Sequence, residues 1–186
     1  PDGERYMAAM AAAANFAWAN RHVLAHEARQ AFATAFGTSP ARTAMRLVFD
    51  VAHNLAKIER HEVGGRSREL CVHRKGATRA FGPGHPYLHA DLQPVGQPVL
   101  IPGSMGTASW VLAGTGANPA FDSAAHGAGR LMSRKKAKAR ELGHVVRRDL
   151  ETAGIAVRPG SVKLLSEEAP YAYKDVDEVV DVCPRA

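Results

Sequence analysis

The segment from Asp122 to Arg140 reads DSAAHGAGRLMSRKKAKAR. One histidine, His126, stands in front of a glycine-flanked turn, and a basic run follows it. Glycine lets a backbone approach a ligand closely, and the free N–H groups at the start of a helix favour an anion. We therefore expect the turn to open a helix over residues 127–150, ended by Gly154, with His126 beside a site suited to phosphate.

The first residues of that expected helix carry the charge. Arg130 and Arg134 are four residues apart, which places them on one helical face. Guanidinium groups hold phosphate through paired hydrogen bonds, and a neutral imidazole beside phosphate is a suitable nucleophile toward phosphorus. The alternative interpretation is a capping turn before a solvated basic helix.

Composition limits the class of protein. The chain has 186 residues, a formal net charge of +6 and a pI of about 9.6, which suits RNA, DNA or a phosphorylated small molecule as a partner. Its two cysteines, Cys71 and Cys183, form no CxxC pair, which fits a reducing compartment. No apolar run reaches the roughly 18 residues of a membrane-spanning helix, and the first residues lack the layout of a signal peptide. We expect a cytoplasmic protein without a membrane segment.

Periodicity predicts two helices in the first third of the chain. Alanine-rich residues 6–36 favour one long helix or two, ended by Gly37. Ser39-Pro40 is a helix start signal, and apolar residues at near-helical spacing predict a second helix over residues 41–62. Gly64-Gly65 would end it.

The remaining segments predict strands and loops, so the fold class is α+β. We expect a strand and a turn at Gly76 within residues 70–81, and a loop over 81–96. A strand, a loop and a second strand are expected over 98–112, a strand region over 155–165, and a short helix or strand over 175–182. The sequence carries no clear domain boundary, and because both ends of the chain fall within expected elements we expect part of a larger fold.

Four further segments carry chemistry, each with a structural alternative. VHRKGATRA places Arg74 and Lys75 where they could bind backbone phosphates, or form an exposed basic hairpin. IPGSMGTAS offers N–H groups and hydroxyls to a nucleotide, although it lacks the GK[ST] of a P-loop. DVAHN places His53 as a metal ligand or a core residue, and Tyr173 of EEAPYAYKDVDEVV could stack on a base or pack internally.

Taken together, the segments resemble the RtcB family of RNA ligases. The resemblance implies an RtcB-like fold of mixed helices and β-sheet, incomplete relative to the full-length family, with residues 1–186 forming a C-terminal portion. The shared segments follow the family's order and cover nearly the whole chain: AANFAWANR (13–21), DVAHN (50–54), VHRKGATRAF (72–81), IPGSMGTASW (101–110), HGAGRLMSR (126–134) and EEAPYAYKDVDEVV (167–180).

The resemblance implies a reaction. Members of the family use GTP and Mn²⁺ to join RNA ending in a 2′,3′-cyclic phosphate or 3′-phosphate to RNA with a 5′-hydroxyl, in tRNA splicing or RNA repair. A histidine is first guanylylated, GMP then passes to the RNA 3′-phosphate, and the 5′-hydroxyl displaces it. By motif match that histidine is His126.

The resemblance also implies roles for other residues. His53 matches a manganese ligand, Asn54 lies beside the guanylate, and Tyr173 matches a tyrosine near the guanine. Arg130 and Arg134 match basic residues that hold RNA or phosphate. The matches to nucleotide-contacting residues are Pro102, Gly103, Ser104, Met105, Ser109, Gly127, Ala128 and Gly129.

Three departures from the family pattern stand out. The N-terminal half, which carries most of the family's metal ligands, is absent, and so is the closing lysine-glycine. Ala125 stands where the family usually has cysteine. The resemblance therefore implies that a ligase would need the N-terminal half on another chain, or an accessory activating protein. The alternative is a nucleotide- or RNA-binding fragment without ligase activity, whose affinity for RNA would fall steeply with salt.

Overall fold

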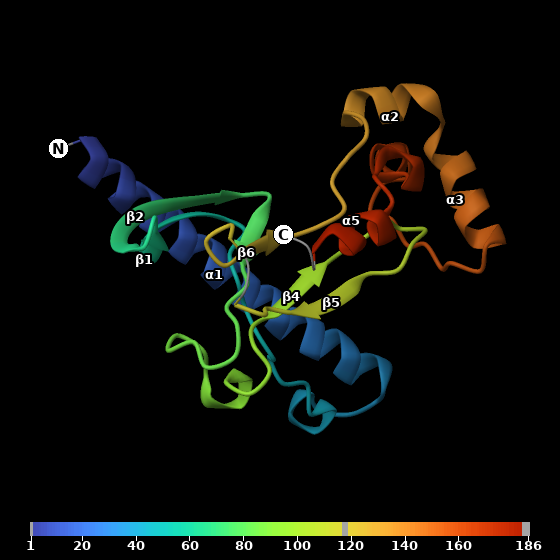
Figure 1. Ribbon diagram of the computed structural model, residues 1–186. Helices are drawn as coiled ribbons and strands as arrows, with labels where there is room; N and C mark the ends of the chain where they lie inside the picture. Colours follow the sequence, from blue (N-terminus) through green and yellow to red (C-terminus); the bar gives the residue numbers. More distant parts are fainter. Residues whose placement is uncertain (1, 117–118, 184–186) are drawn as a thin grey trace. The chain divides into compact units, whose positions relative to one another are not determined.

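The computed structural model describes residues 2–116 and 119–183 (Figure 1). It combines helices with small antiparallel sheets, so the expected α+β class is confirmed. The chain divides into two compact units, Pro1–Lys75 and Gly76–Ala186, which we call unit 1 and unit 2 and describe separately. No helix within the described ranges is long and apolar enough to cross a membrane.

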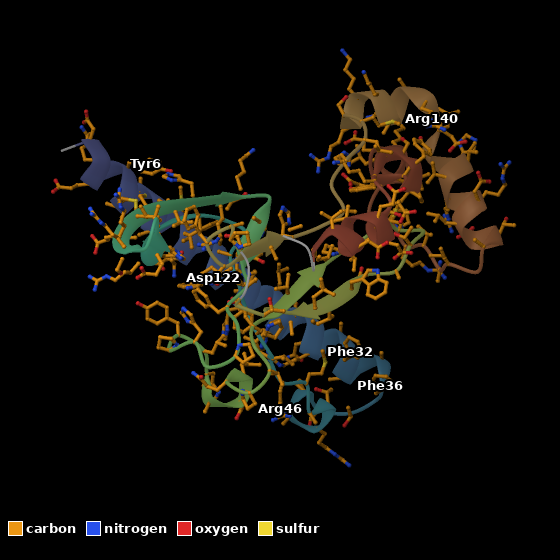
Figure 2. All side chains as sticks on the ribbon, viewed as in Figure 1. Tyr6, Phe32, Phe36, Arg46, Asp122 and Arg140 are labelled. Carbon is orange, nitrogen blue, oxygen red and sulfur yellow. The ribbon has the colours of Figure 1, made fainter. Side chains whose placement is uncertain are left out.

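Unit 1 begins with one long helix, the first of the two alternatives that the alanine content predicts. Helix α1 spans Asp2–Ala35, and Ala33 is the side chain of this helix that is buried. Gly37 ends the helical path with a φ of +60°, a conformation that glycine adopts without steric cost. Figure 2 labels Phe32 and Phe36 at this end, where their ring centroids lie 6.0 Å apart.

The prediction of a second helix over residues 41–62 is wrong. A short 3₁₀ turn, η1 (Pro40–Thr43), leads into irregular chain, and strand β1 (Asn54–Val63) pairs along its whole length with β2 (Arg66–Lys75). The two residues between the strands, Gly64 and Gly65, both have positive φ, which a tight hairpin turn requires. A turn that matches the strand twist, with ten cross-strand pairs behind it, outweighs a weak helical preference.

Unit 2 is built on two further pairs of strands. Strand β3 (Ala77–Arg79) pairs with β6 (Ser123–Ala125), and β4 (Pro98–Ile101) pairs with β5 (Trp110–Ala113). The predicted strand and turn at Gly76, and the strand, loop and strand over 98–112, are thus confirmed. The expected loop over 81–96 is also found, with one short 3₁₀ turn, η2 (Ala90–Leu92). The buried core beneath these strands comprises Ala80, Val99, Ile101, Ala128 and Val176.

The basic segment is helical, but it does not start where the sequence predicts. Helix α2 spans Arg134–Arg140 and α3 spans Gly143–Thr152. Residues 127–133 are not helical, because Gly129 has a φ of +78° and the hydroxyl of Ser133 accepts the Lys136 N–H as the cap of α2. The glycine turn is therefore a loop beside the helix and not its first turn.

The last quarter of the chain surrounds a second core cluster, formed by Val146, Leu150, Val157, Leu165 and Ala169. The strand predicted over residues 155–165 is wrong, since the segment is irregular up to α4 (Val162–Leu165). It contributes single apolar side chains to the cluster, and these do not alternate with polar residues as they would in a half-buried strand. Two 3₁₀ turns, η3 (Ser166–Glu168) and η4 (Pro170–Ala172), lead to α5 (Val176–Val182), the helical alternative expected for 175–182.

Candidate active site

His126 directly follows β6 and lies next to Gly76, the residue before β3. Its backbone N–H donates to the carbonyl oxygen of Gly76 at 3.4 Å. A Cβ placed on Gly76 would be 3.8 Å from His126 Nε2, so the half-buried imidazole lies against this glycine. Any side chain at position 76 would therefore contact the ring of His126, and glycine at this position avoids that contact.

The two residues after His126 lie along the serine-glycine loop of residues 102–109. The N–H of Ala128 donates to the carbonyl oxygen of Pro102 at 3.1 Å. A Cβ on Gly127 would lie 3.6 Å from the same oxygen. The structure thus brings together the HGAGR and IPGSMGTAS segments, which the sequence gives only as separate motifs.

Side-chain hydroxyls within the 102–109 loop hold its shape. Thr107 Oγ1 accepts the N–H of Ser104 at 2.7 Å, and Ser104 Oγ accepts the N–H of Gly106 at 3.2 Å. Ser109 Oγ accepts the N–H of Gly103 at 3.4 Å. Met105 of the same loop packs against the second core cluster. The loop is therefore preorganised by bonds that are local in sequence.

A third segment, residues 172–174, runs antiparallel to the end of the HGAGR loop. The N–H of Lys174 donates to Gly129 O at 3.0 Å, and the N–H of Leu131 donates to Ala172 O at 2.8 Å. Between these two bonds, Arg130 and Tyr173 form a β-bridge. The predicted guanine-facing tyrosine is thus held beside the predicted nucleophile loop.

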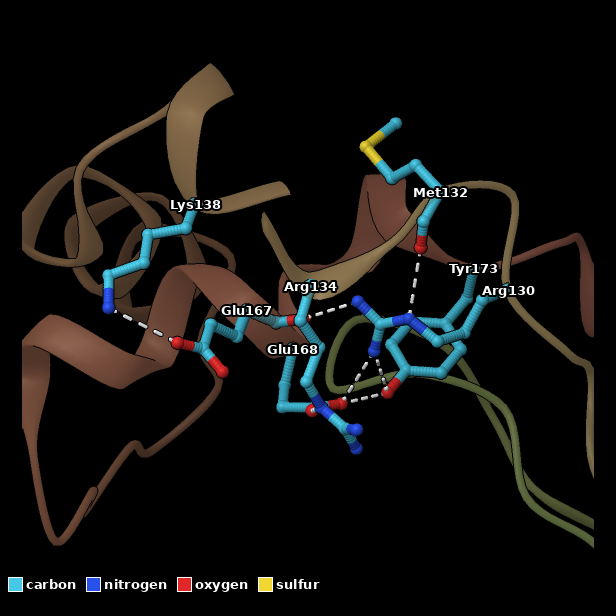
Figure 3. Close-up of polar contacts among 7 residues, drawn as sticks. All are labelled: Arg130, Met132, Arg134, Lys138, Glu167, Glu168 and Tyr173. Carbon is cyan, nitrogen blue, oxygen red and sulfur yellow. Dashed lines mark hydrogen bonds and ion pairs between the residues drawn. The ribbon is translucent and has the colours of Figure 1, made fainter. Parts of the chain in front are cut away.

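Side chains reinforce this bridge (Figure 3). Arg130 Nη1 donates to Glu168 Oε2 and to the Tyr173 hydroxyl, each at 3.0 Å. Arg130 Nε donates to the Met132 carbonyl at 3.1 Å, and Nη2 donates to the Glu167 carbonyl. The Tyr173 hydroxyl donates to Glu168, and the guanidinium carbon lies 4.8 Å from the centre of the tyrosine ring.

The two arginines predicted to hold phosphate differ in this network. All three guanidinium nitrogens of Arg130 donate within the protein. Arg134 donates from Nε to Glu168 Oε1 at 2.8 Å, and its side chain is 67% exposed. Arg134 is therefore the better placed of the two to reach a phosphate in solution.

The network sets the protonation of its two acidic members. Burial favours the neutral form of Glu168, but hydrogen bonds from Tyr173 and Arg134 and the charge of Arg130 outweigh it and hold the pKa of Glu168 below its usual value. Burial, and then the hydrogen bond to Glu168, raise the pKa of Tyr173. The phenol is consequently a proton donor, and the carboxylate is its acceptor.

This arrangement predicts a pH-dependent contribution to stability. Glu168→Gln should lower the free energy of unfolding at neutral pH by about 0.5–1 kcal/mol, because the carboxyl is partly exposed and water screens its pairs. Since its pKa is lowered on folding, that difference should persist above the ordinary carboxyl pKa and vanish as the pH falls through the lowered one. Arg134 and Tyr173, whose pKa values are both raised, keep their protons throughout this range.

Urea unfolding of both chains between about pH 7 and pH 3 measures the difference. A gap between wild type and Glu168→Gln that stays constant down to the lowest pH would contradict the prediction.

Four predicted site residues belong to unit 1 and lie at the open end of its hairpin. Asn54 and Lys75 are the first cross-strand pair of the ladder, and His53 comes directly before it. Arg74 is 5% exposed and donates to both carboxylate oxygens of Glu59, each at 2.8 Å. Its role in phosphate binding stays a prediction, and the structure gives its guanidinium a carboxylate partner inside the hairpin.

The described residues do not assemble a metal site. Within 2–116 and 119–183, no group of three or more His, Cys, Asp or Glu side chains is close enough to hold a metal ion. His53 stays a single predicted ligand, so the described part of the chain does not by itself fit a complete manganese site.

A cavity of about 580 Å³ adjoins the nucleophile loop in unit 2. Its walls come from β3, β6 and α5, and it is largely apolar with two charged groups. The lining residues include Ala77, Ala124, Ala125, Lys174, Glu178 and Val179. Because Ala125 directly precedes His126, this cavity lies next to the candidate nucleophile.

Sequence reasoning missed the residue at the centre of the network. Glu168 stands in the EEAPYAY segment. The signal that could have pointed to it is its negative charge in a chain with a net positive charge. The sequence gives no spacing that relates it to Arg130, which is 38 residues away.

These features define a class of site: a half-buried histidine in a glycine loop, braced by a hydroxyl-rich loop and a tyrosine–arginine–carboxylate network. The family described as "tRNA-splicing ligase RtcB" matches residues 1–186. The chain belongs to the RtcB family.

Named relatives agree with this assignment. The chain is 54% identical over 187 aligned positions to "tRNA-splicing ligase RtcB" of Archaeoglobus fulgidus, covering 100% of this chain and 39% of that protein. It is 55% identical over 181 positions to "RNA-splicing ligase RtcB" of Mycobacterium tuberculosis, covering 97% of this chain and 41% of that one. The chain thus spans about two fifths of the length of these relatives.

Proposed function

We propose that this chain forms the nucleotide-accepting part of an RNA ligase that uses GTP and Mn²⁺. The ligase joins a 2′,3′-cyclic phosphate or 3′-phosphate RNA end to a 5′-hydroxyl end, in tRNA splicing or RNA repair. One observation carries the proposal: three segments, at Gly76, Pro102 and residues 172–174, meet around the loop that begins at His126. The names of the relatives, as RNA-splicing ligases, support the same reaction.

In the proposed first step, an unprotonated ring nitrogen of His126 attacks the α-phosphorus of GTP. A P–N bond forms, the bond from the α-phosphorus to the bridging oxygen breaks, and pyrophosphate leaves with that electron pair. At Gly76 an added Cβ would lie 3.8 Å from His126 Nε2, so glycine keeps that bulk away from the ring. The apolar cavity next to Ala125 offers a surface for the base.

A 2′,3′-cyclic phosphate end would first be opened by water to a 3′-phosphate. In the later steps an oxygen of the RNA 3′-phosphate attacks the histidine-bound phosphorus and breaks the P–N bond, and the 5′-hydroxyl then attacks the activated 3′-phosphorus, forming the phosphodiester as GMP leaves. Bound Mn²⁺ would neutralise phosphate charge, with His53 as one ligand and the others supplied by residues outside this chain. Exposed Arg134 and its neighbours on α2 are the proposed contacts to RNA phosphates.

The test is the intact mass of the chain after incubation with GTP and MnCl₂. We expect an acid-labile adduct of the size of GMP in the wild type and none in His126→Ala. The exposed His144→Ala serves as the matched control and should keep the adduct. If the chain alone gives none, the N-terminal portion of the Archaeoglobus relative is added, and no adduct under either condition would overturn the ligase proposal.

Exposed basic residues on α2 favour a second candidate, an RNA-binding fragment without ligase activity. Arg134, Lys135 and Lys136 are all exposed. This function predicts RNA affinity that falls steeply with salt and no GMP adduct. The same mass measurement, combined with RNA binding at two salt concentrations, separates the two functions.

A further inference from the structure

The carboxylate of Glu168 receives hydrogen bonds from three separate parts of unit 2. Arg130 and Tyr173 donate to Oε2, and Arg134 donates to Oε1 (Figure 3). The first donor comes from the nucleophile loop, the second from the strand-like segment beside it, and the third from α2. Charge-assisted bonds of this kind are the stronger class of hydrogen bond.

We propose that Glu168 is a positioning residue that fixes the Tyr173 phenol and the Arg130 side chain, and through them the His126 loop, for nucleotide transfer. The proposal rests on the function proposed above. It assigns Glu168 no contact with the reacting atoms.

The backbone pairing at this point is too short to fix the loop by itself. Three backbone hydrogen bonds join the segments around a single β-bridge: Lys174 donates to Gly129 at 3.0 Å, and Leu131 and Met132 both donate to Ala172, at 2.8 and 3.5 Å. Even a two-stranded hairpin is only marginally stable in water. Side chains must therefore supply the remaining restraint. Arg130 and Tyr173 both donate a hydrogen bond to Glu168, so this carboxylate links the two side chains of the bridge.

The same contacts assign Arg130 to positioning. Its Nε and Nη2 donate to the carbonyls of Met132 and Glu167, which lie on either side of the bridge. With Nη1 on Glu168, the guanidinium ties the end of the loop to η3. Tyr173 is held from both sides, by its own bond to Glu168 and by the bond from Arg130.

A matched pair of variants separates positioning from simple loss of charge. Glu168→Gln keeps the shape but has one carbonyl oxygen in place of two carboxylate oxygens. Glu167→Gln removes a neighbouring charge whose carboxylate pairs with Lys138 at 3.2 Å. Glu168→Asp keeps the charge on a shorter side chain and should restore part of the function.

Two readouts do not depend on ligase activity. The ionisation of Tyr173, followed by phenolate absorbance as the difference from Tyr173→Phe, should move to lower pH in Glu168→Gln and stay unchanged in Glu167→Gln. Amide hydrogen exchange at Leu131 and Lys174 should become about tenfold faster in Glu168→Gln, because one charge-assisted bond holds the pairing closed. If neither readout moves, the positioning proposal is overturned.

A third readout concerns the nucleotide itself. The GTP concentration that gives half-maximal rate of adduct formation should rise about tenfold in Glu168→Gln, as for loss of one hydrogen bond to a charged group. It should return toward the wild-type value in Glu168→Asp. Equal GTP dependence in wild type and Glu168→Gln would overturn the positioning role while leaving the proposed function intact. If the wild type forms no adduct either alone or with the N-terminal portion of the relative, but the other two readouts change, the proposed function fails and the positioning of Tyr173 by Glu168 stands.

Discussion

Gly96→Ala should lower the free energy of unfolding by about 3 kcal/mol, the combined cost of a strained backbone and a steric clash. Gly96 has a φ of +87°, a conformation that alanine rarely adopts. A Cβ at this position would lie 2.2 Å from Gly114 O and 3.3 Å from Phe81 O. Both neighbours are backbone atoms, so the clash cannot be relieved by rotating a side chain.

Urea unfolding followed by circular dichroism measures this change, and the chain provides its own control. Gly84 has a φ of +77° but no atom within 4 Å of an added Cβ. Gly84→Ala should therefore carry only the conformational penalty, of about 1 kcal/mol. If the two variants lost the same free energy of unfolding, the steric clash predicted at Gly96 would be contradicted.

The second large effect is expected at Arg74. Arg74→Ala should lower the free energy of unfolding by about 3 kcal/mol, because it leaves Glu59 buried without its guanidinium partner. The side chains of Arg74 and Glu59 are 4% and 8% exposed, and two 2.8 Å bonds join them. His61, at 3.0 Å from Glu59, replaces only part of the lost interaction.

The control removes both charges at once. In the double variant Arg74→Met with Glu59→Leu, no buried charge remains unpaired, and stability should return close to that of the wild type. Thermal unfolding of the single and double variants tests this. RNA binding of the double variant tests the other role predicted for Arg74, since a phosphate contact would be lost even where stability is restored.

Local signals in the sequence predicted those elements whose stability is local. The alanine content of residues 6–36 predicted α1, because helix propensity acts within a few residues. Two apolar runs around a glycine-serine centre predicted β4, β5 and the loop between them. These predictions needed no partner from a distant part of the chain.

Two of the wrong predictions concern segments whose structure is decided by a hydrogen-bonding partner outside the segment. Residues 54–63 have near-helical apolar spacing, but they form a strand because β2 pairs with all ten of them. The glycine turn before α2 was expected to start a helix, yet its carbonyl and N–H groups bond to residues 172–174. Helical periodicity cannot report a hydrogen-bonding partner that lies more than 40 residues away.

By itself, the sequence determined the candidate nucleophile, the basic character of the surface near it and the family of the protein, because each depends on the identity and order of residues. Only the tertiary structure decided what each charged residue does. Arg130, Arg134 and Arg74 have the same side chain, but one is enclosed by four partners, one is mostly exposed, and one is buried against Glu59. The free energy of a guanidinium depends on the acceptors around it and on its exposure to water, and the folded chain sets both.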